Sequence, residues 1–254
     1  MTLDRKSLAL PLKTHLIIDG EEGAASDGRT FERENPADAS ETVTVSVRAT
    51  VDDARAAVDA ARRAFDNNTD NWVHDYKLRE RVLYRTAQLM RENTQNLAAV
   101  VSLEVGMPIR QAIPHVSAAA DVFEYYAGMA GKMYGDSFFL ANGSMINLIK
   151  EPMGVVGLIT PWNFPLTQTA RKLAPALAVG CTVVVKPASY TPAATYELMK
   201  LVQEAGAPNG VSNYVAGPGA VVGDELVKNP KIDKVSFTGE TEIGKGIAAR
   251  AAMD

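Results

Sequence analysis

The stretch GVVGLITPWNFP, residues 154–165, has the pattern of a buried strand that ends in a rigid turn. Its first half is almost entirely apolar, as in a central parallel strand that is covered on both faces. Pro161 and Pro165 restrict the backbone of the turn, which presents Trp162 and Asn163. Ligands of open α/β sheets bind at the carboxyl ends of the strands, so this turn is a candidate site. On these residues alone an alternative stays open, in which Asn163 only caps the next helix and Trp162 only packs.

From residue 152 onward, strand patterns alternate with helical patterns. Strict alternation of this kind is typical of a parallel, doubly wound sheet. The predicted fold class is therefore α/β with a Rossmann-like parallel sheet. The expected strands lie near 155–159, 182–186, 213–215 and 233–237, and the expected helices near 165–179, 192–205, 220–228 and from 240 onward.

The first half of the chain predicts an N-terminal helical region. Thr50 and Asp53 have the spacing of an acidic capping box, which marks the start of the first helix. The aromatic residues Phe123, Tyr125 and Tyr126 are interpreted as core residues. Short strands are expected at 16–19 and 42–47, and further helices over 77–104, with an interruption near 93–94, and over 109–131.

Asn142 and Gly143 stand between two apolar runs, which is the strongest short-range signal for a β-hairpin. We expect this hairpin, residues 132–151, to protrude from the domain. An isolated two-stranded ribbon is only marginally stable in water, so the hairpin is expected to pair with another chain in a homo-oligomer, a dimer or a tetramer. The chain is thereby divided into a discontinuous dinucleotide-binding domain, 1–131 and 152–254, and an oligomerisation hairpin.

Composition excludes several classes of protein. The 254 residues carry a formal net charge of −4 and show no basic and aromatic cluster, so no nucleic-acid partner is expected. The apolar segment near the amino terminus is interrupted by Pro11, Lys13 and His15, so neither a signal peptide nor a membrane span is expected, and a cytoplasmic location is predicted. The single cysteine and the three scattered histidines predict no metal site.

Three further turns follow the other expected strands, and all four turns are expected to meet at one edge of the sheet. Lys186, Ala188 and Ser189 follow the second strand, where the lysine could hold a ribose or phosphate or could simply be solvated. Gly219 and Gly223 follow the third strand, where they could approach a nucleotide or only form a tight turn.

The last strand ends in the sequence FTGETEIG, residues 237–244. Free backbone N–H groups at the helix start that follows can bind a pyrophosphate. Glu240 and Glu242 suit the helix dipole, but their charge would repel a phosphate beside them.

The four turns, PWNFP at 161–165, KPAS at 186–189, GPG at 217–219 and FTGETEIG at 237–244, occur in this order in one family. The chain resembles the NAD(P)-dependent aldehyde dehydrogenases over almost its whole length. The resemblance implies that Asn163 donates its amide to the oxyanion of a thiohemiacetal formed from the aldehyde substrate, and that NADP or NAD is the cofactor. The cofactor-binding residues that it implies are Ile159, Thr160, Pro161, Trp162 and Asn163 near the nicotinamide; Lys186, Ala188 and Ser189 near the ribose; Gly219 and Gly223 near the adenine; and Phe237, Thr238, Gly239, Glu240 and Ile243 near the pyrophosphate.

Two residues depart from the pattern of this family. Many relatives have serine where this chain has Glu240, so backbone amides would have to bind the pyrophosphate. Many NAD-preferring relatives have glutamate where this chain has Ser189. Because a carboxylate there would repel a 2′-phosphate, serine predicts that NADP is accepted.

The family also needs a cysteine nucleophile and a glutamate base from a second domain, and neither motif is present here. Cys181 begins a buried strand at the end opposite the site and is interpreted as structural. The catalytic domain is therefore expected to be absent from this chain, and the chain alone is predicted to be inactive. Two hypotheses follow: the chain belongs to an enzyme that oxidises an aldehyde to a carboxylic acid, or it is a non-catalytic nucleotide-binding or interaction module.

Overall fold

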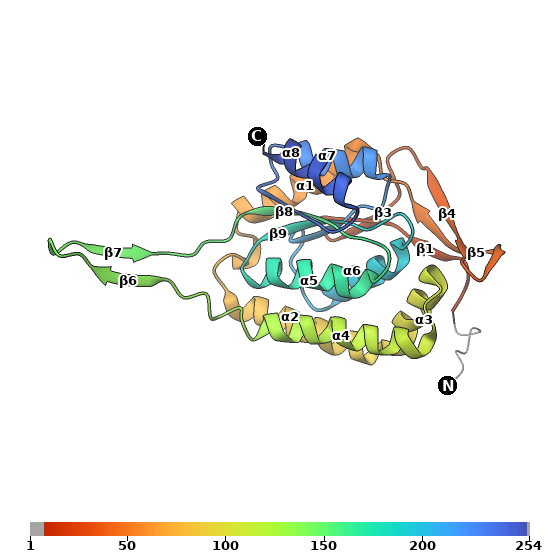
Figure 1. Ribbon diagram of the computed structural model, residues 1–254, viewed down its shortest axis with the longest axis horizontal. Coiled ribbons are helices and arrows are strands. Elements are labelled where there is room, and N and C mark those ends of the chain that lie inside the picture. The colour runs from red at the N-terminus through yellow and green to blue at the C-terminus, as the bar shows by residue number, and fades with distance from the viewer. Residues whose placement is uncertain (1–7, 253–254) are drawn as a thin grey trace.

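The computed structural model describes residues 8–252. The first seven residues of the predicted N-terminal domain segment and the last two residues of the chain lie outside this range. The described chain forms helices on both faces of a central sheet, from which a long hairpin projects (Figure 1). The predicted α/β class with a doubly wound, Rossmann-like sheet is confirmed.

The central sheet has six strands in the order β11-β8-β9-β10-β2-β3. Its parallel part contains β8 (Val155–Ile159), β9 (Thr182–Lys186), β10 (Ser212–Tyr214) and β11 (Lys234–Phe237), close to the four predicted strands. All residues of β8 and β9 are buried, as expected for strands that are covered on both faces.

The amino-terminal strands were only partly predicted. β2 (Leu16–Ile18) and β3 (Glu21–Gly23) add to the edge of the central sheet, and both pairings are antiparallel. A separate three-stranded sheet contains β1 (Leu12–Thr14), β5 (Asp38–Val47) and β4 (Thr30–Asn35). Gly23 and Asn35 are the last residues of β3 and β4.

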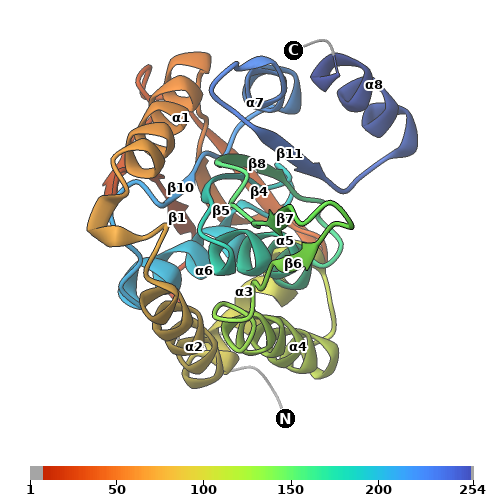
Figure 2. The ribbon, with the colours of Figure 1, turned by 90° about the vertical axis from the view of Figure 1, so that its left-hand side faces the viewer.

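Helices of both halves of the chain cover the central sheet. α1 (Val51–Asp66) lies on one face, on the same side as α7 (Asp224–Lys228) and α8 (Thr241–Ala251), whereas α5 (Pro165–Ala178) and α6 (Pro192–Glu204) cover the other (Figure 2). α2 (Tyr76–Glu92), α3 (Thr94–Val105) and α4 (Ile109–Ala127) form an outer layer against α5 and α6. Short helical turns, η2 (Thr69–Asn71) and η3 (Gly219–Gly223), complete the described elements.

Local sequence signals explain where several helices begin. Thr50 and Asp53 form the predicted capping box at the start of α1. The amino end of α6 lacks a cap of its own, and Glu104 of α3 supplies one, since its carboxylate accepts hydrogen bonds of 2.9 Å from the amides of Ala193 and Ala194. This contact fixes the turn between β9 and α6, where several candidate site residues lie.

The interpretation of the three aromatic residues on α4 was partly wrong. Phe123 is fully buried, but the side chain of Tyr125 is 63% exposed. Two residues along an α-helix correspond to a rotation of about 200°, so Phe123 and Tyr125 lie on opposite faces of α4.

The hairpin consists of β6 (Asp136–Phe139) and β7 (Met145–Leu148), which pair only with each other. It extends far from the body of the molecule (Figure 1). Its large apolar side chains are exposed: Phe138, Phe139, Leu140, Met145, Leu148 and Ile149. Among the helices of residues 8–252, none is long and apolar enough to cross a membrane.

Candidate functional site

The carboxyl ends of the parallel strands meet at one edge of the sheet. Ile159 is the register partner of Lys186 on one side and of Phe237 on the other, so the turns that follow β8, β9 and β11 are neighbours. Backbone hydrogen bonds extend these pairings, because the Thr160 amide donates to the Lys186 carbonyl and the Thr238 amide to the Ile159 carbonyl. The structure therefore places three of the four predicted turns side by side.

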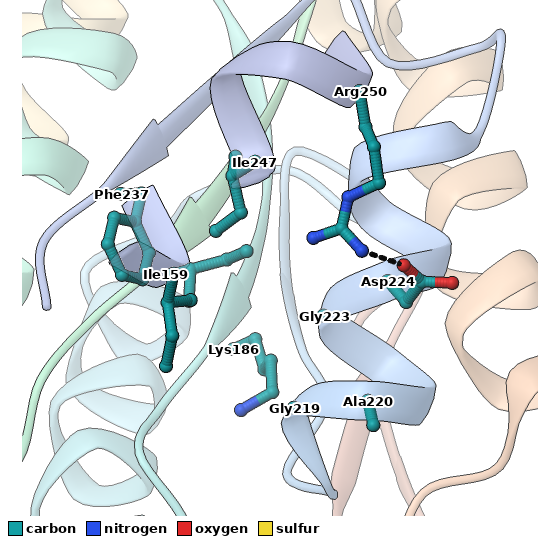
Figure 3. Close-up of a pocket in the computed structure, with 10 residues that line it drawn as sticks. Ile159, Lys186, Gly219, Ala220, Gly223, Asp224, Phe237, Ile247 and Arg250 are labelled. Carbon is teal, nitrogen blue, oxygen red and sulfur yellow. Dashed lines mark hydrogen bonds and ion pairs between the residues drawn. The ribbon is translucent and has the colours of Figure 1, made fainter. Parts of the chain in front are cut away.

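A cavity of about 310 Å³ opens at this edge between β8, β9 and the helices α7 and α8 (Figure 3). We call it the glycine-lined cavity. Six of the predicted cofactor residues line it, and so do four residues that the sequence reasoning missed. The predicted residues are Ile159, Lys186, Gly219, Gly223, Phe237 and Ile243, and the others are Ala220, Asp224, Ile247 and Arg250.

The two glycines of this cavity are not required by packing. A Cβ at Gly219 would meet no atom within 4 Å, and a Cβ at Gly223 would only touch the side chains of Lys186 and Ile159. At Gly217, in contrast, a Cβ would lie 2.6 Å from Val222. The tight-turn explanation therefore applies to Gly217, whereas side chains at Gly219 and Gly223 would fill the cavity. Such a surface suits the close approach of a flat or phosphorylated ligand.

Lys186 is 4% exposed, so the interpretation as a solvated lysine was wrong. Its Nζ donates a 2.9 Å hydrogen bond to the carbonyl of Pro187, and Figure 3 shows the side chain pointing into the cavity. Burial lowers the pKa of Lys186 to about 8. Ser189, three residues on, donates a longer hydrogen bond of 3.4 Å to the carbonyl of Gly217, so its turn is linked to the glycine turn.

Asp224 and Arg250 form an ion pair of 2.8 Å at the rim of the glycine-lined cavity (Figure 3). The sequence carried no signal for this pair, because the partners come from α7 and α8 and are 26 residues apart. Ile247 could have been found, since it lies one helical turn after Ile243 on the same face of α8.

The start of α8 differs from the expected pyrophosphate site. The Glu240 carboxylate accepts 2.9 Å hydrogen bonds from the amides of Glu242 and Ile243. These hydrogen bonds lower the pKa of Glu240, so the group is a carboxylate at neutral pH. Glu240 thus occupies the backbone donors that were expected to meet a phosphate.

Asn163 does not cap a helix. The N-cap of α5 is Phe164, and no side chain caps that end. Asn163 is exposed, and its amide has no hydrogen-bond partner among residues 8–252. Trp162 is 52% exposed and meets the ring of Tyr190 edge-on, with ring centroids 6.4 Å apart. The capping alternative therefore fails for Asn163, whereas Trp162 does pack in part, against Tyr190. Of the remaining predicted residues, Pro161 and Ala188 lie in the same two turns, and Gly239 packs against the ring of Phe237.

Lys172 of α5 connects α5 to the last turn. Its Nζ donates to the hydroxyl of Thr238 at 2.7 Å and to that of Ser236 at 3.4 Å. Burial lowers the pKa of Lys172. The sequence reasoning did not select this residue, although it lies on α5 only two turns beyond the PWNFP sequence.

Cys181 lies at the other end of the sheet. It precedes β9, whose first residue pairs with Val155 at the start of β8. The thiol is 2% exposed, and burial raises its pKa, so it is mostly protonated at neutral pH. Among residues 8–252, no three histidine, cysteine or acidic side chains gather where they could hold a metal ion.

Comparison with known proteins agrees with this geometry. The aldehyde dehydrogenase family matches residues 24–254. The chain belongs to the aldehyde dehydrogenase family. It is 42% identical to the betaine aldehyde dehydrogenase of Bacillus subtilis over 93% of its length, and 40% identical to the NADP-dependent succinate-semialdehyde dehydrogenase of Escherichia coli over 94%.

A solved structure of similar fold is the NAD-dependent aldehyde dehydrogenase of Sinorhizobium meliloti, with a TM-score of 0.94 and 36% identity. The match covers 99% of this chain and 50% of that one. The two curated relatives are likewise covered to 48% and 49%. The chain therefore spans about half the length of these three relatives.

Proposed function

We propose that this chain is the cofactor-binding part of an NAD(P)-dependent aldehyde dehydrogenase, which oxidises an aldehyde to a carboxylic acid. The position of Asn163 carries this proposal. Its amide is exposed and unpaired among residues 8–252, and it follows β8 four residues after Ile159, which lines the glycine-lined cavity. An uncommitted amide N–H in a rigid turn is suited to stabilise the negative charge that develops on a reacting carbonyl oxygen.

The residues of the glycine-lined cavity fit a dinucleotide. Gly219 and Gly223 would admit the adenine, with Ile243 and Ile247 as apolar neighbours, and Lys186 would bind the ribose hydroxyls or a 2′-phosphate. When bound, the nicotinamide accepts a hydride from the substrate. The residues of the PWNFP turn, Trp162 above all, would orient the nicotinamide beside Asn163.

Within this proposal NADP is accepted together with NAD. Ser189 places no carboxylate in the turn after Lys186, the Asp224 carboxylate of the cavity is paired with Arg250, and the Lys186 ammonium supplies a counter-charge for a phosphate. Calorimetric titration with both cofactors tests this part of the proposal. A dissociation constant for NADP more than tenfold weaker than that for NAD would contradict it.

We further infer that the nucleophile and the general base come from residues outside this chain. Cys181, the single cysteine of the sequence, is buried at the sheet end opposite Asn163, and its thiol is mostly protonated. In this division, 1–131 and 152–254 form the cofactor-binding domain. The 132–151 hairpin, with its exposed apolar side chains, would join copies of the enzyme into a homo-oligomer.

The buried position of Cys181 also favours a second candidate, a nucleotide-binding module without catalysis. The intact mass of the protein that the native host produces separates the two. A mass near twice 27.2 kDa, with NAD(P)H formation from added aldehydes, supports the dehydrogenase. A mass near 27.2 kDa, with cofactor binding but no turnover, supports the module.

A further inference from the structure

Lys186 is the buried lysine of the described chain, and its amine borders open space. The residue is 4% exposed, whereas the other lysines between residues 8 and 252 are exposed or half-buried. Figure 3 shows the side chain extending from the end of β9 into the glycine-lined cavity. A small molecule that enters this cavity therefore meets the amine directly.

The amine of Lys186 has no carboxylate partner among the residues of the described chain. Its Nζ donates one hydrogen bond of 2.9 Å, to the carbonyl of Pro187. The acidic residue of the cavity wall, Asp224, is already paired with Arg250 at 2.8 Å and with Lys228 at 2.7 Å. Because the Pro187 carbonyl engages only one N–H, the lone pair of the neutral amine stays free to attack a carbonyl carbon.

The surroundings also favour the neutral form of this amine. Burial lowers the pKa of Lys186 to about 8. At pH 7 about one molecule in ten then carries a neutral amine, against about one in 3,000 for a lysine of ordinary pKa. Lysines that are desolvated in apolar pockets form Schiff bases with carbonyl compounds, because only the neutral amine is a nucleophile.

The walls of the glycine-lined cavity suit an uncharged adduct on this amine. Ile159, Ile243 and Ile247 are apolar, and a Cβ at Gly219 would meet no atom within 4 Å, so space remains beside them. The volume of about 310 Å³ lies at the lower end of the range for small-molecule sites, about 300 to 1,000 Å³, which fits an aldehyde of a few carbon atoms. An imine nitrogen is much less basic than an amine, so the adduct removes a charge that this environment stabilises poorly.

We propose that Lys186 is a site of reversible covalent modification by uncharged aldehydes, and that the adduct excludes a dinucleotide from the glycine-lined cavity. The lone pair of Nζ forms an N–C bond to the aldehyde carbon, and an amine proton moves to the aldehyde oxygen to give a carbinolamine. Loss of that hydroxyl and of the second amine proton as water leaves a C=N bond. No oxidant or reductant takes part, and hydrolysis reverses the reaction.

The exclusion of the cofactor rests on the proposed function, whereas the formation of the imine does not. Lys186 is the residue that would bind the ribose hydroxyls or a 2′-phosphate, so an alkylidene group on its nitrogen removes that contact and occupies the same space. Aldehyde in excess then competes with NAD(P), and the cofactor relieves the inhibition. The enzyme is slowed when aldehyde accumulates while oxidised cofactor is scarce.

The test uses the protein as its native host produces it, freed of nucleotide and incubated at pH 7 with butanal and sodium cyanoborohydride. The hydride reduces each imine to a stable secondary amine, and peptide mapping by mass spectrometry gives the rate of butylation at each lysine. We expect Lys186 to react at least tenfold faster than Lys77, an exposed lysine of α2. Saturating NADP should suppress the reaction at Lys186 and leave that at Lys77 unchanged.

A variant that leaves the lysine in place tests the role of the cavity. Gly219→Val fills part of the cavity that Lys186 borders and should slow its butylation at least tenfold. Gly246→Val is the matched control, because a Cβ at Gly246 also meets no atom within 4 Å, but Gly246 does not line the cavity. The butylated wild-type protein is then titrated with NADP in a calorimeter, where we expect a dissociation constant at least tenfold weaker than that of the unmodified protein.

Labelling without turnover separates failure of this inference from failure of the proposed function. Fast butylation of Lys186 in a protein that binds neither NAD nor NADP upholds the modification site and refutes the proposed function. Butylation of Lys186 that is no faster than that of Lys77, or that Gly219→Val leaves unchanged, overturns the inference. NADP binding that neither protects Lys186 nor is weakened by butylation overturns it as well.

Discussion

Replacement of Lys186 by methionine is expected to stabilise the protein at neutral pH. The ammonium is 4% exposed and has one hydrogen-bond acceptor, the Pro187 carbonyl, so its charge is poorly compensated. Burial lowers its pKa from 10.5 to about 8. At about 1.36 kcal/mol per pKa unit, keeping this charge in the folded protein costs up to about 3 kcal/mol. Methionine keeps most of the apolar stem and removes the charge.

The sign of the pH dependence follows from this depressed pKa. Below pH 8, Lys186 is protonated in both the folded and the unfolded protein. The free-energy cost of burying its charge is then fully present. Between pH 8 and 10.5 the unfolded chain binds more protons than the folded one, so the stability of the wild type rises with pH. The advantage of Lys186→Met therefore shrinks across this interval.

Urea unfolding of both proteins at pH 7, 8.5 and 10 measures this difference. Lys77→Met is the control, because Lys77 is exposed on α2 and should show neither effect. The reasoning would be refuted if the Lys186→Met protein were less stable than the wild type at pH 7. It would also be refuted if the difference between their free energies of unfolding did not change with pH. The same variant should bind NADP more weakly, so stability would rise while cofactor affinity falls.

Three further changes test other parts of the site. Glu240→Ser removes the carboxylate that now binds the amides of Glu242 and Ile243 and would repel a phosphate. We therefore expect NAD(P) affinity to rise about tenfold in a fluorescence titration. Unchanged affinity would show that the cofactor does not reach these amides. Ser189→Glu introduces a carboxylate near the 2′-position and should weaken NADP binding at least tenfold more than NAD binding; equal losses would place the 2′-phosphate elsewhere. Burial depresses the pKa of His115 to about 4, so between pH 6.5 and pH 4 the residue is protonated only in the unfolded protein, and stability falls by up to about 3 kcal/mol as the pH falls through this range. His115→Gln should flatten this part of the pH profile of thermal unfolding. An unchanged slope would assign the acid sensitivity to other groups.

Local signals were read correctly from the sequence. The Thr50 and Asp53 capping box depends on residues three apart, and the structure has it as predicted. The parallel strands were found because β8 and β9 are apolar on both faces. The residues at their carboxyl ends were found with them, since strand register alone brings Ile159, Lys186 and Phe237 together.

Features that depend on contacts between distant residues were either not predicted or predicted wrongly. The pairing of β2 with β10 joins residues almost 200 positions apart, and nothing local specifies it. The Asp224 and Arg250 pair depends on how α7 and α8 are placed. Tyr125 was assigned to the core by residue type, although its position on α4 turns it away from Phe123. Glu240 was recognised as awkward for a phosphate, but its capping of its own helix depends on a side-chain conformation that the sequence does not specify.

The antiparallel addition of β2 to β10 has a consequence during synthesis on the ribosome. The amide of Asp19, directly after β2, is bonded to the side chain of Asn213, so the two partners are 194 residues apart. At about 5 to 20 residues per second, the nascent chain would carry the apolar strand Leu16–Ile18 for roughly 10 to 40 s before β10 exists. During that interval β3 can pair with one edge of the strand, but the edge that later meets β10 has no native partner, so it is open to pairing with other chains.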